Sequence, residues 1–250
     1  MRAIFTLVRR ELASYLVTWT GYILIAAAAF LMGWSFVVML VQLRLQSSPM
    51  PVTELFFGTQ YFWFILLLTA PLITMRLFAA EKLSGTFETL MTTPVRDGQV
   101  VAAKFIAALI FFLLLWTPLV GCLLVAARFT GGGVALDAGT LGGALFGLVL
   151  LGALFLAIGC FASALTRSQI VAAMTSLVIC LGLFLLSFLS ESLTMATGWA
   201  GRLLACAALA NYMDDFSRGI VDTRPVVFCL SLTAFFLFLT LRVVESRRWS

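Results

Sequence analysis

Apolar residues fill six long stretches of this chain, and charged residues separate them. The stretches without a charged side chain run over 12–43, 55–75, 105–127, 138–166, 168–190 and 225–241. Each is close to or longer than the roughly 20 residues that a helix needs to cross a bilayer. The last is short, but Arg242 can extend its charged end to the interface. The pattern predicts six transmembrane helices, near 16–43, 57–78, 101–127, 140–166, 168–190 and 225–244.

Composition supports a membrane protein with a single domain. Hydrophobic residues make up 62% of the 250 residues and charged residues 11%, whereas about a quarter of the residues of a soluble domain are charged. No polar block is long enough for a separate soluble domain. We therefore expect one all-α polytopic membrane domain over 1–250. Residues 1–13 are expected to form an interfacial helix that carries Ile4, Leu7, Val8 and Leu12 on one side.

The region 191–221, between the fifth and sixth predicted spans, is neither a span nor a typical loop. Its two neutral runs, 192–201 and 203–213, are too short to cross a membrane but strongly apolar. They predict short external re-entrant helices, with Trp199 and Tyr212 at the interface. The candidate external gate also includes Asp214, Asp215, Arg218 and Gly219. Arg218 is four positions after Asp214, so the two can pair on a helix, and Gly219 can end that helix.

Basic residues predict the orientation. With six spans both termini share a side, and that side receives 11 of the 16 Lys and Arg residues. Cytoplasmic loops carry such an excess. The sequence therefore predicts a multi-pass protein of the cell (inner) membrane with both termini in the cytoplasm.

A polar segment follows the second predicted span on the cytoplasmic side. An apolar stripe with helical spacing, expected to bury against the bundle, comprises Leu83, Phe87, Leu90 and Met91. Glu81, Glu88, Thr89 and Thr92 lie off this stripe, and Pro94 ends the pattern. Residues 81–93 are therefore predicted to form an amphipathic helix at the membrane surface, which by its spacing alone could either dock a partner or float at the interface.

The chain has no evident energy source or catalytic centre of its own. No ionisable residue lies at the centre of a predicted span, where ion-driven transporters usually keep one. The GxxxxGK[ST] phosphate loop of ATPases is absent, and so is histidine. These features argue against an enzyme, a metal site or a nucleic-acid-binding protein, and predict no cofactor. If the protein performs work, a separate subunit must supply the energy.

Three segments together resemble a known family. The stretch from Ala70 to Phe105, "APLITMRLFAAEKLSGTFETLMTTPVRDGQVVAAKF", resembles the signature of ABC-2 type permeases of the gliding-motility and multicopper-enzyme-maturation group. The entry segment Val8–Ala26 and the exit segment Asn211–Phe228 resemble the same family. The resemblance extends over the whole chain with its spacing in order.

The resemblance implies the membrane-spanning permease subunit of an ATP-binding-cassette exporter. It implies a separate cytoplasmic ATPase that binds the ATP, and a second permease copy or a sister permease in the bilayer. It also implies that 81–93 is a coupling helix on which the ATPase docks. The expected coupling residues are Arg76, Glu81, Lys82, Gly85, Thr86, Phe87, Glu88, Leu90, Pro94 and Lys104.

One alternative stays open from the residues alone. A membrane anchor or scaffold could recruit a cytoplasmic ATPase without passing a substrate. A neighbouring gene with a phosphate loop and an ABC signature would favour the transporter, and its absence the scaffold. The substrate also stays open, because the spans are uniformly apolar.

Overall fold

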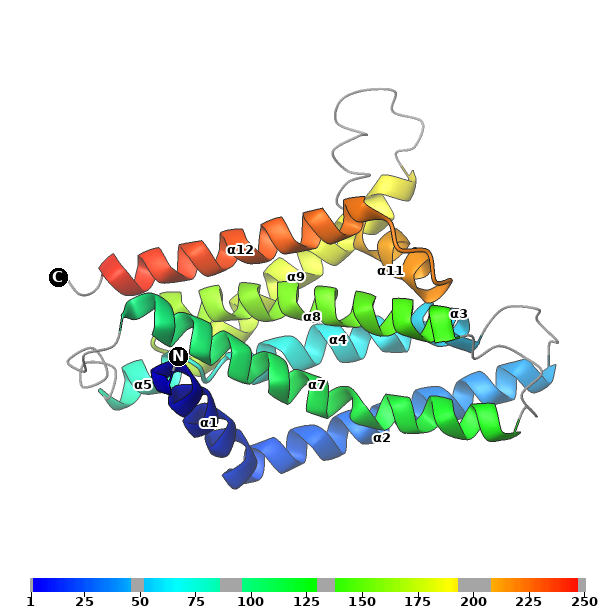
Figure 1. The fold of residues 1–250 in the computed structure, drawn as a ribbon, viewed down its shortest axis with the longest axis horizontal. Coiled ribbons are helices and arrows are strands. Elements are labelled where there is room, and N and C mark those ends of the chain that lie inside the picture. The colour runs from blue at the N-terminus through cyan, green and yellow to red at the C-terminus, as the bar shows by residue number, and fades with distance from the viewer. Residues whose placement is uncertain (1, 46–51, 86–95, 130–137, 193–207, 247–250) are drawn as a thin grey trace.

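All the regular secondary structure in the described part of the chain is α-helical. A computed structural model describes residues 2–45, 52–85, 96–129, 138–192 and 208–246. Its helices, labelled in Figure 1, are α1 (Arg2–Val17), α2 (Trp19–Leu45), α3 (Val52–Phe57), α4 (Gln60–Thr74), α5 (Ala79–Ser84), α7 (Asp97–Phe129), α8 (Ala138–Leu165), α9 (Gln169–Ser192), α11 (Leu209–Ser217) and α12 (Thr223–Ser246). Six stretches among the described residues are long and apolar enough to cross a membrane. The prediction of an all-α protein with six spans is confirmed.

The helices of the six candidate spans run back and forth along the length of the molecule. These helices are α2, α4, α7, α8, α9 and α12. Helices α1 and α5 lie at one end of the bundle, together with both termini (Figure 1). We call this the terminal end. The short helices α3 and α11 lie at the opposite end, the distal end (Figure 1). This placement agrees with an even number of spans.

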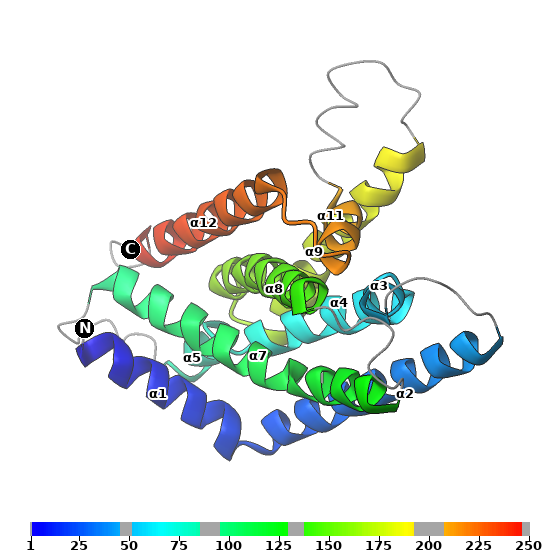
Figure 2. The same ribbon diagram turned by 45° about the vertical axis from the view of Figure 1, so that its right-hand side comes forward.

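Helix α8 forms the centre of the bundle. It contacts α4, α7, α9, α11 and α12, and Figure 2 shows it surrounded by the other helices. In its apolar window 72% of the residues are buried, against 22% in α9 and 17% in α12. The many Gly and Ala residues of α8 let neighbouring helices approach closely. The outer helices keep apolar faces that suit contact with lipid.

Helices α3 and α11 close the distal end. Leu209, Met213 and Phe216 of α11 are buried against the bundle. The Thr53 hydroxyl of α3 donates a hydrogen bond of 3.0 Å to the Ser217 carbonyl oxygen. Gly219, with φ of 81°, follows α11. Within the predicted re-entrant region 191–221, residues 193–207 lie outside the described residues.

Helix α1 packs against α7 through the apolar side predicted from its sequence. The predicted interfacial helix covered 1–13, whereas α1 extends to Val17. Val8 is buried against Ala103 and Ala107 of α7, with Ile4, Leu7 and Leu12 at the edges of this contact. Small side chains on α7 allow this close approach, so α7 covers this apolar side.

The second span ends in a turn, not in one continuous helix. Helix α4 stops at Thr74, residues 75–78 form a turn, and α5 begins at Ala79. Gly85 then adopts φ of 73°, a left-handed conformation that suits glycine and ends a helix. The structure describes only the first part of the predicted helix 81–93, as α5, which begins at Ala79 and ends at Ser84. Residues 86–95 lie outside the described residues, so the rest of the helix stays a prediction.

Candidate functional site

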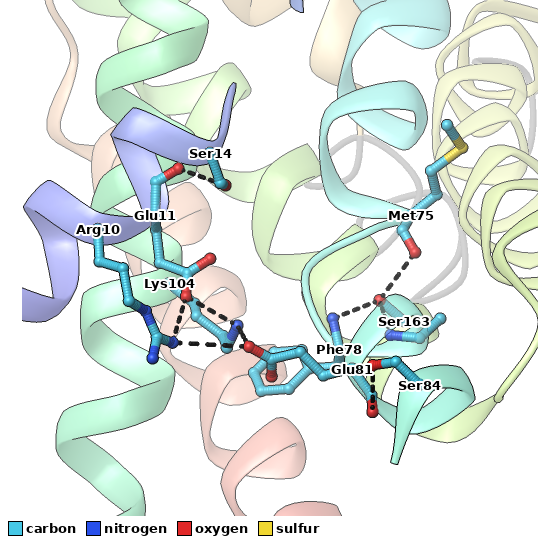
Figure 3. A network of polar contacts seen from close by, with 10 residues as sticks. Arg10, Glu11, Ser14, Met75, Phe78, Glu81, Ser84, Lys104 and Ser163 are labelled. Atoms are coloured by element: carbon cyan, nitrogen blue, oxygen red, sulfur yellow. Dashed lines mark hydrogen bonds and ion pairs between the residues drawn. The ribbon is translucent and has the colours of Figure 1, made fainter. Parts of the chain in front are cut away.

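A buried lysine joins three helices at the terminal end. Lys104 lies two turns into α7, and 2% of its side chain is exposed. Its Nζ atom is 2.8 Å from Oε1 of Glu81 on α5 and 3.2 Å from Oε1 of Glu11 on α1 (Figure 3). Burying an unpaired ammonium group would be very costly, so these carboxylates are what allow a charged lysine here.

Arg10 supplies a second positive charge for the two carboxylates. Its Nη2 atom is 2.8 Å from Oε1 of Glu11 and 3.7 Å from Oε1 of Glu81, and about half of its side chain is exposed. Two acidic and two basic side chains therefore form a neutral group, which we call the Lys104 cluster: Arg10, Glu11, Glu81 and Lys104. Lys104 Nζ also lies 5.4 Å from the centre of the Phe78 ring, within range of a cation–π interaction.

A serine from α8 caps the start of α5. The Oγ atom of Ser163, which is fully buried, accepts hydrogen bonds of 3.1 Å from the backbone N–H groups of Phe78 and Ala79. It donates one of 3.3 Å to the Met75 carbonyl oxygen (Figure 3). Free N–H groups at a helix start need such an acceptor, which usually comes from the same chain segment. Ser163 supplies it from another helix and so ties α5 to α8.

Two basic residues fasten the same region. Lys82 Nζ donates to the Ala164 carbonyl oxygen near the end of α8, where the helix dipole favours a positive charge. Arg76 donates to the Thr20 hydroxyl at the start of α2. The α4–α5 turn and α5 are thus attached to α2 and α8 as well as to the Lys104 cluster.

Tyr15 secures the second half of α1. Its hydroxyl donates a hydrogen bond of 2.9 Å to the Ile73 carbonyl oxygen of α4, and its ring stacks on Phe111 of α7 at 4.7 Å. Desolvation by burial raises the pKa of the Tyr15 phenol well above its ordinary value, and the nearby Cys160 and Glu11 add to this effect. The phenol therefore stays protonated and keeps its donor role.

The structure brings together only part of the predicted coupling set. Arg76, Glu81, Lys82 and Lys104 lie in the contacts just described, and Gly85 ends α5. The remaining predicted residues lie outside the described residues: Thr86, Phe87, Glu88, Leu90 and Pro94.

Two details of the predicted amphipathic helix are wrong. Leu83, which we expected to bury against the bundle, is 70% exposed. Glu81, expected to face a partner, is turned towards Lys104. The α4–α5 turn and the Ser163 cap fix how α5 is rotated about its axis, and an isolated helical wheel contains neither constraint.

Three residues of the site were missed from the sequence: Arg10, Glu11 and Ser163. Glu11 carried a signal, because its spacing from Leu7 and Val8 places a carboxylate on the apolar face of α1. An acidic residue on a buried stripe requires a partner. Ser163 carried no comparable signal, since a serine among small residues is ordinary in a transmembrane helix.

The candidate gate residues lie at the distal end. Tyr212 is half-buried, with its ring centre 6.1 Å from that of Phe228 on α12. Asp214 and Asp215 are half-buried on α11, while Arg218 is exposed. Trp199 lies outside the described residues.

An apolar groove runs along the bundle between α2 and α9, with α4 at its base. Its volume is about 880 Å³. The lining is mainly aromatic and includes Trp34, Trp63 and Phe184, while Gln60 provides a polar group at the start of α4. Trp63 packs on Phe184 with ring centres 4.8 Å apart. The groove lies in the half of the spans nearer the distal end.

Comparison with known proteins identifies the family of this chain. A family model described as "ABC-2 family transporter protein" matches residues 22–201, well over half of the chain. The match begins in α2 and continues past the end of α9, so it includes α5, Lys104 and Ser163. No curated protein matches the chain. With its six apolar helices, this chain belongs to the ABC-2 family of transporter proteins and is an integral membrane permease component of an ABC transporter.

Proposed function

We propose that the chain is the membrane-spanning permease subunit of an ATP-binding-cassette exporter, driven by a separate cytoplasmic ATPase. Family membership supports a permease that works with an ATPase, because the chain itself has no phosphate loop. The resemblance of 70–105 to the gliding-motility and multicopper-enzyme-maturation group supports that subgroup. The basic-residue excess at the terminal end supports an inner-membrane protein with both termini in the cytoplasm.

The observation that carries the proposal is the fastening of α5. This six-residue helix leads directly into the segment that we assign to the ATPase. Its Glu81 pairs with Lys104 of α7 and with Arg10 of α1, and its Lys82 and its N-terminus bind α8. A force applied at Leu83 or just beyond Gly85 would therefore pass into three helices at once. A loosely attached surface helix would dissipate it.

A second permease subunit is part of the proposal. The apolar groove over α4 is not fully enclosed by this chain, and one six-span chain would enclose half of a pathway. Two such grooves facing each other would form a chamber lined by aromatic side chains, which favours an apolar or amphipathic substrate. Homodimer and heterodimer both fit this arrangement.

Copurification tests the docking surface. Leu83→Asp and Glu88→Lys permeases, tagged and purified from native membranes, should retain less of the ABC ATPase than the unaltered protein. Leu83 is largely exposed, so its replacement should leave the amount of folded permease unchanged. Ile220→Asp, at an exposed apolar position of the distal end, is the matched control. Equal ATPase recovery with all three variants would contradict docking at this segment.

A distance measurement separates the transporter from the scaffold. Spin labels at Trp34→Cys and Leu181→Cys, on opposite walls of the groove, should report a change in separation when ATP and vanadate are added to the complex. A scaffold would bind the ATPase with no such change.

A further inference from the structure

Lys104 has two counter-ions that come from different helices. Oε1 of Glu11 on α1 and Oε1 of Glu81 on α5 both lie within 3.2 Å of its Nζ atom. Either carboxylate alone would compensate the buried ammonium group. Lys104 therefore does not need both carboxylates to compensate its charge. Both carboxylates are needed, however, for Lys104 to link α1 with α5.

The attachments of α1 and α5 outside the cluster lead to different parts of the bundle. Helix α1 packs on α7 through Val8 and Tyr15. Helix α5 is fastened to α8 through the Ser163 cap and through Lys82. The cluster thus bridges two separately anchored helices.

The carboxylate of Glu81 is the less completely satisfied of the two. Its Oε2 atom is buried and has no hydrogen-bond partner among the described residues, while Arg10 lies 3.7 Å from its Oε1 atom and only 2.8 Å from that of Glu11. A buried acceptor without a donor costs free energy. Glu81 therefore loses less than Glu11 would when its contact with Lys104 breaks.

We propose that the Lys104 cluster is a releasable joint between α1 and α5. In the engaged state Lys104 binds both carboxylates, as in the structure. In the released state α5 moves away with Glu81, and Lys104 stays paired with Glu11. This inference rests on the proposed function, since release would be the step that the ATPase drives through α5.

The joint predicts opposite effects for two similar substitutions. Glu81→Gln weakens the link to α5 while Lys104 keeps Glu11, so the released state becomes more populated. Glu11→Gln removes the counter-ion that release requires, because the departure of Glu81 would then leave a buried charge unpaired. The second variant should therefore stay engaged. A rigid structural cluster would be loosened by both substitutions.

Spin-label distances in the permease alone test this. Labels at Ala13→Cys and Leu83→Cys, both exposed positions, are introduced into a cysteine-free chain in lipid nanodiscs. We expect one main distance in the parent, a second and longer population in Glu81→Gln, and no longer population in Glu11→Gln. Glu245→Gln, which breaks the surface pair with Arg242, should match the parent. If the label distances change in the same way in Glu81→Gln and Glu11→Gln, or change in neither, the proposal of a releasable joint is wrong.

Thermal unfolding provides a second measurement that does not depend on labels. Each single Gln variant should lower the Tm by about 2–4 °C, the shift expected for about 1 kcal/mol in a chain of this size. Glu11→Gln/Glu81→Gln should lower it by clearly more than the sum, because Lys104 then has no counter-ion. Adding Lys104→Met to the double variant should restore part of the loss. Additive shifts would contradict the shared counter-ion.

Neither measurement requires the ATPase. If Leu83→Asp leaves ATPase recovery unchanged while the joint behaves as expected, the assigned docking surface is wrong and the joint stands. If docking is confirmed and the two Gln variants behave alike, the joint is wrong and the proposed function stands.

Discussion

Gly159 of α8 lies so close to Thr74 of α4 that a Cβ atom on the glycine would be 2.0 Å from the threonine Oγ1 atom. The Thr74 hydroxyl is itself held, donating 2.8 Å to the Ala70 carbonyl oxygen. This contact lies where α4 ends, just before the turn that leads to α5. The absence of a side chain at 159 therefore sets how closely the end of α4 approaches the central helix.

Gly159→Ala should destabilise the permease by about 1–3 kcal/mol, the usual cost of overpacking a well-filled core. Thermal unfolding in detergent measures the effect. Gly182→Ala is the matched control, because a Cβ at that helical glycine would meet no atom of the described residues within 4 Å. Equal Tm values for the two variants would show that α4 and α8 can separate without cost.

Ser163→Ala should loosen α5 without unfolding the bundle. The variant leaves the N–H groups of Phe78 and Ala79 without their acceptor, at a cost of about 1–3 kcal/mol. Hydrogen exchange at these two amides should become faster. Ser231→Ala, which removes an exposed hydroxyl bonded within α12, should leave their exchange unchanged, and unchanged exchange in Ser163→Ala would refute the cap.

Tyr15→Phe should weaken the attachment of α1 while keeping the ring stack. Loss of the bond to the Ile73 carbonyl oxygen should cost about 1 kcal/mol at neutral pH. Tyr22→Phe, at an exposed tyrosine, serves as the control and should have no such effect.

The same residue predicts how stability changes at alkaline pH. Burial raises the pKa of Tyr15 in the folded protein above its ordinary 10.0, so above about pH 10 the unfolded chain releases a proton that the folded chain keeps. Its contribution to stability is complete below pH 10 and is lost as the pH rises further. The Tm of Tyr15→Phe should therefore fall less steeply above pH 10 than that of the unaltered protein. Parallel curves would contradict a buried, protonated phenol.

Cysteine labelling tests the proposed orientation. In a cysteine-free chain, Arg96→Cys at the terminal end and Val221→Cys at the distal end are both exposed positions. A membrane-impermeant maleimide added to intact cells should label position 221 and spare position 96, and lysis should make both reactive. Labelling of position 96 alone in intact cells would reverse the orientation.

The sequence by itself determined the helical class and the six spans. A bilayer leaves few alternatives, because each crossing needs about 20 apolar residues whose backbone groups are all satisfied within the helix. The charged residues that interrupt these runs are therefore visible without any tertiary information. The segment near Glu81 and Lys104 was also found in this way, since polar residues stand out in so apolar a chain.

Only the tertiary structure decided which of these residues meet. Lys104 is 93 positions from Glu11 and 23 from Glu81, and no local pattern relates them. Helical periodicity gave the two faces of the segment that contains Leu83, but it could not say which face turns inward. That choice was made by the turn after Thr74 and by Ser163 on α8, because a six-residue helix takes its orientation from the groups that hold its ends.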